Sequence, residues 1–326
     1  LGVVPTHIKF VGGLVPDDNG LLPRDANGEL IVLSEMKLLT EMSPVKIGST
    51  QISVFPGVAD EDTEEMINGL RGLDLAVHLI LMVGGADPMN PADEDKVVEM
   101  LKSGLEVAKK YNIKEVASTS IEEWMQPGAS PKTGADYDAA IAQNVKLHIR
   151  ALNETNAIEA GIQHWHIEFL RGGEFQTFTN VAKCWDFIKA INAEMGSKFF
   201  KVMVDAAHCG DSDLSIPENE LKIAEIAASD EFSMFHASAK TTRGCLSTDD
   251  GWIGALLTAA AKTGKLETVF VELFHHNDEA LEALRNLEPG HGVDTTDGRS
   301  YNEVVADGLG DTAHRLNNLV ARGFLS

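Results

Sequence analysis

Short apolar runs recur along the chain, and each is followed by a stretch whose apolar residues have helical spacing. Successive runs begin about 35 to 40 residues apart, which is the size expected of one βα unit. The pattern predicts eight strands, at His7 to Leu14, Val45 to Phe55, Leu75 to Val83, Lys114 to Ser118, His164 to Leu170, Phe200 to Asp205, Phe232 to His236 and Thr268 to Phe274.

The intervening segments have the features of amphipathic helices. From Asp93 to Tyr111, the residues Val97, Leu101 and Leu105 fall on one stripe, and the first turn is acidic, which suits the helix dipole. Comparable spacing predicts further helices at Asp136 to Ala160, Asn180 to Met195 and Ile253 to Lys262.

Alternating strands and helices indicate a parallel sheet covered by helices, and eight such units predict a single-domain (β/α)8 TIM barrel over residues 1–326. The main competitor is an open doubly wound sheet. No strand is followed by a Gly-x-Gly-x-x-Gly turn that opens a helix, which argues against a dinucleotide site. Two segments depart from the repeat. Pro16 to Leu30 reads as a loop over the barrel mouth or an edge arm, and Leu287 to Arg299 as a loop before a terminal helix at Tyr301 to Val320.

The charge balance excludes one class of partner. The chain has 27 basic and 50 acidic residues, a formal charge of -23, whereas a nucleic-acid surface needs a basic stripe. We therefore expect no nucleic-acid partner. The most apolar window, Leu73 to Val83, is too short to span a bilayer, so no membrane partner is expected either. Cys184, Cys209 and Cys245 are too few for a disulfide framework, and the expected compartment is reducing and cytoplasmic.

Polar residues close the last four apolar strands. They are Glu168, Asp205, His236 and Glu272, separated by 37, 31 and 36 residues. Alone, each such acid more often bonds loop amides, and a lone histidine is more often part of the core. Together they fall at matching height on strands five to eight, and neighbouring strands lie only about 4.8 Å apart.

Three carboxylates that converge would repel one another and raise each other's pKa values, and a divalent cation removes this conflict. The four residues therefore predict one divalent metal ion. Oxygen-rich ligation with one nitrogen favours Mn, Mg or Co, with Zn also possible.

The Glu/Asp/His/Glu order resembles the xylose isomerase-like TIM barrel superfamily of sugar isomerases and epimerases, and most closely its ketose 3-epimerase branch (D-tagatose and D-psicose 3-epimerase). Glu174 fits the branch's second glutamate, His208 its Asp-x-x-His, and Arg243 the arginine after the metal histidine. The resemblance covers residues 164–275 well and the first half in architecture. The segment around Arg243, Ser-Ala-Lys-Thr-Thr-Arg-Gly, differs from that of the epimerases, and the loop after strand eight is longer.

The resemblance implies proton abstraction next to a carbonyl through a metal-stabilised enediolate, acting on a small carbohydrate or polyol-derived substrate. Glu168 and Glu272 would be metal ligands as well as acid and base, with Asp205 and His236 completing the metal site. Glu174 and His208 would bind substrate hydroxyls or orient the ligands.

Three further residues are expected near the substrate. Arg243 would orient a substrate oxygen or anionic group, or form a loop salt bridge. Lys240, a solvated loop lysine on the simpler interpretation, would join Arg243 in binding a phosphate or carboxylate. Trp124 would form an apolar wall. His164 and His166 alternate with Trp165 along strand five, and the sequence offers no partner for His164.

Other functions remain open on the same ligands. One is a metal-dependent dehydratase of a keto-cyclitol or dehydroshikimate-like substrate. A second is an endonuclease IV-like DNA-repair nuclease, but that family uses a histidine-rich three-zinc cluster, and His78 is the one obvious extra ligand in the first half. A third is a non-catalytic sensor or scaffold. Family analogy suggests a homodimer or homotetramer.

Overall fold

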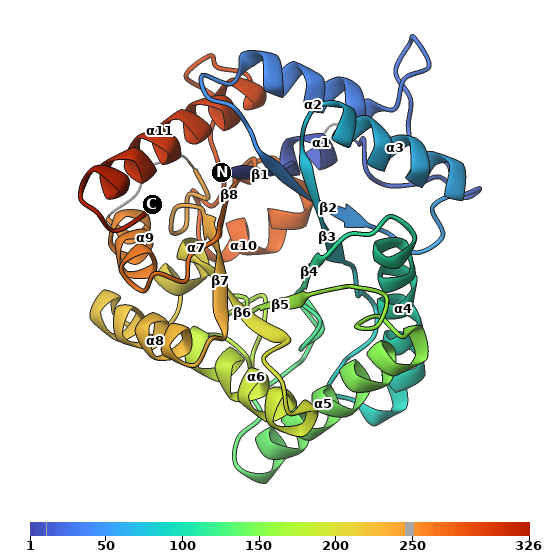
Figure 1. Cartoon of the computed structure of the whole chain (residues 1–326), viewed down its shortest axis with the longest axis vertical. Helices are drawn as coiled ribbons and strands as arrows, with labels where there is room; N and C mark the ends of the chain where they lie inside the picture. Colours follow the sequence, from blue (N-terminus) through green and yellow to red (C-terminus); the bar gives the residue numbers. More distant parts are fainter. Residues whose placement is uncertain (11, 245–250) are drawn as a thin grey trace.

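The computed structural model describes residues 1–10, 12–244 and 251–326, and in this part of the chain eight parallel strands close into a barrel in sequence order (Figure 1). The predicted TIM barrel is therefore confirmed. Cys245 lies outside the described residues. The strands are β1 (Gly2–Val4), β2 (Ser49–Val54), β3 (Ala76–Leu81), β4 (Glu115–Ser118), β5 (His164–Glu168), β6 (Phe200–Asp205), β7 (Phe232–Ala237) and β8 (Thr268–Glu272).

The first predicted strand is wrong. Residues 7–10 instead belong to the short helix α1 (Thr6–Phe10), and the first strand is β1 (Gly2–Val4). β1 pairs with both β2 and β8, which closes the barrel. A Cβ on Gly2 would lie 2.2 Å from Ser49 Oγ and 2.6 Å from the Phe270 ring. Glycine usually weakens a strand, but here the close packing of these two side chains requires it.

Helices form a ring around the barrel (Figure 1). The predicted helices correspond to α4, α5, α6, α9 and α11, with bounds shifted by a few residues. The short helices α7 and α10 follow β6 and β8. The helices not yet introduced are α2 (Ile31–Met42), α3 (Asp60–Gly72), α4 (Glu94–Lys110), α5 (Ala135–Thr155), α6 (Val181–Met195), α7 (Ala206–Gly210), α8 (Ile216–Ala228), α9 (Trp252–Lys262), α10 (Glu282–Leu287) and α11 (Tyr301–Ala321).

The polar segment at residues 16–30 runs along α3. The Leu22 amide donates to Asp62, and Arg24 pairs with Asp62 at 2.6 Å and with Glu65 at 2.8 Å. The segment is thus an arm at the edge of the barrel. In the described residues, no helix combines the length and apolar character that a membrane crossing requires.

The inside of the barrel is divided by an apolar layer. Val4, Ala117, Met203, Met234 and Phe270 form a buried cluster separate from the larger core between strands and helices. Because side chains alternate along a strand, polar residues two positions beyond this layer lie at one end of the barrel or the other. Those at the carboxyl ends of the strands form the candidate active site.

Candidate metal centre and active site

Strand ends β5 to β8 bring Glu168, Asp205, His236 and Glu272 together, as the sequence predicted. One potential ligand atom from each lies within 4.8 Å of the others, and all four residues are buried. His236 Nδ1 is 3.2 Å from Glu272 Oε2 and 3.5 Å from Glu168 Oε1. Asp205 and His236 are direct partners in the β6–β7 register, which fixes their common height.

The four side chains are electrostatically unbalanced. Burial raises the pKa of Glu168, and raises that of Asp205 well above its usual value, with the neighbouring carboxylates adding to both. Burial opposes the charged form of His236, but Glu272 and Glu168 outweigh it and raise the His236 pKa well above its usual value. Burial likewise opposes ionisation of Glu272, and His236 outweighs it and lowers the Glu272 pKa. The carboxylates therefore favour a positive charge among them.

The donor set fits a divalent cation. Three carboxylates and one imidazole match the oxygen-rich ligation of Mn²⁺ or Mg²⁺. Glu168 Oε1 is buried with no hydrogen-bond partner, a costly state for an acceptor that a cation would relieve. One oxygen of Asp205 accepts from the Ala207 amide at 2.6 Å, where Asp205 caps α7, and this contact holds the carboxylate in place.

Gln51 orients the histidine of this cluster, and sequence reasoning missed it. Its Oε1 lies 2.8 Å from His236 Nε2, across the barrel from β2 to β7. Because an amide oxygen can only accept, Nε2 keeps a proton, and the proton that His236 loses on metal binding is the one on Nδ1, which faces the carboxylates. The Gln51 amide nitrogen lies 3.3 Å from the Met234 sulfur, which supports this orientation. Gln51 therefore presents Nδ1 as the ligand atom.

Gln51→Met should weaken metal binding about 10- to 100-fold, because loss of the acceptor frees His236 to rotate or to change tautomer. The measurement is calorimetric titration of chelator-treated protein with Mn²⁺. Gln143→Met is the matched control, since Gln143 is also buried but donates to Glu94 at the helix α4–α5 contact. Equal Mn²⁺ affinities in the two variants would contradict this role.

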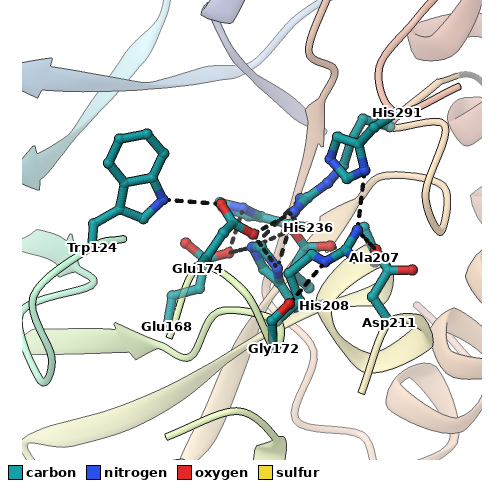
Figure 2. A network of polar contacts seen from close by, with 12 residues as sticks. Trp124, Glu168, Gly172, Glu174, Ala207, His208, Asp211, His236 and His291 are labelled. Carbon is teal, nitrogen blue, oxygen red and sulfur yellow. Dashed lines mark hydrogen bonds and ion pairs between the residues drawn. The ribbon is translucent and has the colours of Figure 1, made fainter. Parts of the chain in front are cut away.

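A second set of polar residues lies beside the cluster (Figure 2). Arg243 is 2% exposed, and its Nη2 lies 3.2 Å from Glu174 Oε2, while its Nη1 lies 3.5 Å from Asp205. His208 Nε2 is 3.4 Å from Asp205 and 3.6 Å from Glu168. Burial and the charge of Arg243 lower the His208 pKa well below its usual value, so this imidazole stays neutral. Glu174, His208 and Arg243, three of the residues predicted to contact substrate, thus lie beside the cluster.

Trp124 and Lys240 are placed differently. Trp124 follows β4, is 41% exposed, and donates its indole N–H to Glu174 Oε1 at 3.1 Å (Figure 2). It can provide a wall at the mouth. Lys240 Nζ lies 5.8 Å from the centre of the Trp252 ring, and Arg243 is bonded to Glu174 and Asp205. The expectation that Lys240 would join Arg243 in binding a phosphate or carboxylate stays a prediction. His78, on β3, packs edge-on against Phe270 at 5.3 Å and is not part of the cluster.

Sequence reasoning also missed a network that supports the Gly-Gly turn. Arg171 contacts Asp211 at 3.2 Å, Glu288 at 3.1 Å and His291 at 3.0 Å. Figure 2 shows Asp211 and His291 on the side of the site away from Trp124. Gly173 has φ = 101°, a conformation that favours glycine. The turn returns the chain so that Glu174 reaches Arg243. The network joins this turn to the loop that follows β8.

Comparison with known proteins adds evidence at the level of fold. No model of a protein family matches the sequence, and a search of curated proteins gives no match. Among solved structures, D-allulose 3-epimerase from Methylomonas sp. is 15% identical, with a TM-score of 0.69, over 90% of this chain and 93% of that chain.

Two other structures extend the likeness. A protein from Anabaena variabilis, provisionally assigned as a sugar phosphate isomerase/epimerase, is 16% identical with a TM-score of 0.74, over 98% of this chain and 99% of that chain. The 3-keto-D-glucoside 4-epimerase from E. coli is 14% identical with a TM-score of 0.59, over 92% and 98%. The chain thus has the TIM-barrel fold of solved sugar isomerases and epimerases, ketose 3-epimerases among them, in agreement with the resemblance that its second half carries.

Proposed function

We propose that the protein is a divalent-metal-dependent sugar epimerase or isomerase that moves a proton at a carbon next to a carbonyl. The observation that carries the proposal is the buried cluster of Glu168, Asp205, His236 and Glu272, in which two glutamates from different strands flank one point. The epimerases among the structural neighbours support the same reaction class. Within this class we favour ketose 3-epimerisation.

When bound, one divalent ion would polarise the substrate carbonyl and stabilise the negative charge that develops on its oxygen. Asp205 and His236 would hold the ion together with the two glutamates. The reacting carbon would then lie between Glu168 and Glu272.

The two glutamates would perform the proton transfers. One carboxylate takes the proton from the carbon, and the C–H electron pair moves into the carbonyl to give an enediolate. The other, in its protonated form, returns a proton to the carbon from the opposite face, which inverts the stereocentre. Transfer to the neighbouring carbon instead would give aldose–ketose isomerisation.

Three buried residues would position the substrate. Glu174 and neutral His208 would bind substrate hydroxyls. The Glu174 carboxylate is held at both oxygens, because Oε2 lies 3.2 Å from Arg243 and Oε1 accepts a hydrogen bond from Trp124. Trp124 would cover the apolar face of the sugar. The two cations at this point, Arg243 and Arg171, are both neutralised by carboxylates, which favours an uncharged substrate over a phosphorylated one.

The test is a metal-supplemented screen of free ketoses, ketose phosphates, a 3-keto-glucoside and keto-cyclitols in D2O. Uptake of deuterium at carbon next to the carbonyl of a free ketose, dependent on Mn²⁺, is expected and would be detected by NMR and mass spectrometry even when the equilibrium hides the product. Loss of water with an absorbing enone from a keto-cyclitol or dehydroshikimate would instead identify a dehydratase. No exchange with any substrate class would contradict the proposal.

A further inference from the structure

The opposite end of the barrel contains a second group of metal-ligating residues. Glu115 is the first residue of β4, and His164 and His166 are the first and third residues of β5. The β4–β5 register pairs Glu115 directly with His164, and these strands lie side by side in the barrel (Figure 1). One potential ligand atom from each residue lies within 4.8 Å of the others.

The contacts within this group are compatible with one ion. Glu115 Oε2 is 2.8 Å from His166 Nε2, and Glu115 Oε1 is 3.1 Å from His164 Nδ1. In a tetrahedral site with bonds of about 2.1 Å, donor atoms lie about 3.4 Å apart. The two glutamate–histidine contacts would therefore lengthen by about 0.3 to 0.6 Å. The ligand nitrogens of the two histidines already lie within 4.8 Å of each other. Two imidazoles and one carboxylate are a donor set that zinc uses with an open fourth position.

Burial and charge are also favourable. The His166 side chain is 1% exposed, whereas those of His164 and Glu115 are 27% and 21% exposed, so the group is anchored inside and reachable from solvent. Burial opposes ionisation of Glu115, but hydrogen bonds from the two histidines lower its pKa to about 2. Two further basic side chains lie near the group: His166 affects the pKa of His78, and Lys201 affects the pKa of His166. The preference for zinc over magnesium rests on the two imidazole donors.

We propose that Glu115, His164 and His166 bind a second divalent transition-metal ion, zinc in preference to magnesium, at the amino-terminal end of the barrel. The apolar layer of Ala117, Met203, Met234 and Phe270 separates this site from the Glu168 cluster. The second ion would join β4 to β5 and would not touch substrate. This inference is independent of the proposed epimerase activity.

The experiment measures metal content. Chelator-treated protein is equilibrated with Zn²⁺ in excess Mg²⁺, dialysed and analysed by mass spectrometry of the metal. Because zinc also competes for the Glu168 cluster, a background variant with both Asp205→Asn and His236→Gln removes two of the four ligands of that cluster and is expected to retain one equivalent of zinc at the second site. The background variant combined with His164→Gln or with Glu115→Gln should retain less than a tenth of an equivalent. His314→Gln in the same background is the control, since His314 is an exposed histidine on α11.

Retention of zinc by both of these variants would overturn the inference. X-ray absorption of zinc in the folded background variant gives a second measurement that does not depend on how the His164 and Glu115 variants fold. It should show two imidazoles in the first shell, and a shell of oxygen atoms alone would contradict the site. Neither result depends on turnover, so failure of the second site and failure of the proposed activity are distinguishable.

Discussion

Glu168→Gln and Glu272→Gln are each expected to lower turnover about 10²- to 10⁴-fold, because each removes one of the two groups that transfer the proton. An amide neither accepts nor returns a proton at neutral pH, and it remains a weak metal ligand. The fold should survive in both, since Gln has nearly the same shape and removes one negative charge from a crowded cluster. Turnover and deuterium uptake from D2O are the measurements.

The matched control for these variants is Glu94→Gln. Glu94 is also buried, but it contacts Lys146 and Arg150 at the α4–α5 contact. Its turnover should equal that of the unmodified protein. A more specific result is expected in the active-site pair: each glutamate abstracts the proton from one epimer only, and its partner abstracts from the other epimer, so neither variant should exchange deuterium into both epimers. Full turnover in either, with Mn²⁺ present, would refute the two-glutamate scheme.

Removal of divalent metal should abolish turnover and also destabilise the protein. Free Mn²⁺ at about 100 times its Kd is expected to raise the free energy of unfolding by about 2.7 kcal/mol, because the ion binds the folded state alone. Binding should also release the proton that the carboxylates favour on His236. Thermal melts with chelator and with added Mn²⁺ measure the first effect, and proton release in weak buffer measures the second.

The Asp205→Asn variant distinguishes stabilisation by Mn²⁺ bound at the cluster from a general effect of ionic strength on stability. It should reduce the Mn²⁺-dependent rise in Tm, because Asp205 supplies one ligand oxygen and its other oxygen caps α7. Mn²⁺ at the same ionic strength should stabilise the Glu94→Gln protein as much as the unmodified one. Turnover that persists after exhaustive chelation would exclude the metal role, whatever the outcome of the glutamate substitutions.

The periodic pattern predicted β2 to β8 because each is an apolar run bounded by turns and followed by a helix. β1 was missed because it has three residues, begins with glycine, and is defined by its pairing with β2 and β8. Neither neighbour is near it in sequence. The apolar residues that follow, including Ile8, instead belong to α1.

The cluster of Glu168, Asp205, His236 and Glu272 was predictable because polar residues that end buried strands at regular intervals must meet at one end of a barrel. Gln51 was not, since β2 contains several polar residues and the sequence does not show which of them face inward. The partner of His164 was equally hidden. It depends on the register that aligns Glu115 with His164, and register between β4 and β5 is a property of the folded sheet.

The carboxylate of Glu174 connects two halves of the chain that differ in how strongly they resemble known enzymes. One oxygen accepts from Trp124, in the first half, and the other faces Arg243, in the second. The proposed proton-transfer groups are thus confined to β5–β8, while Trp124, in the loop after β4, contacts the neighbouring Glu174. Directed evolution of substrate range should therefore succeed by varying residues around Trp124, with the proton-transfer machinery left unaltered.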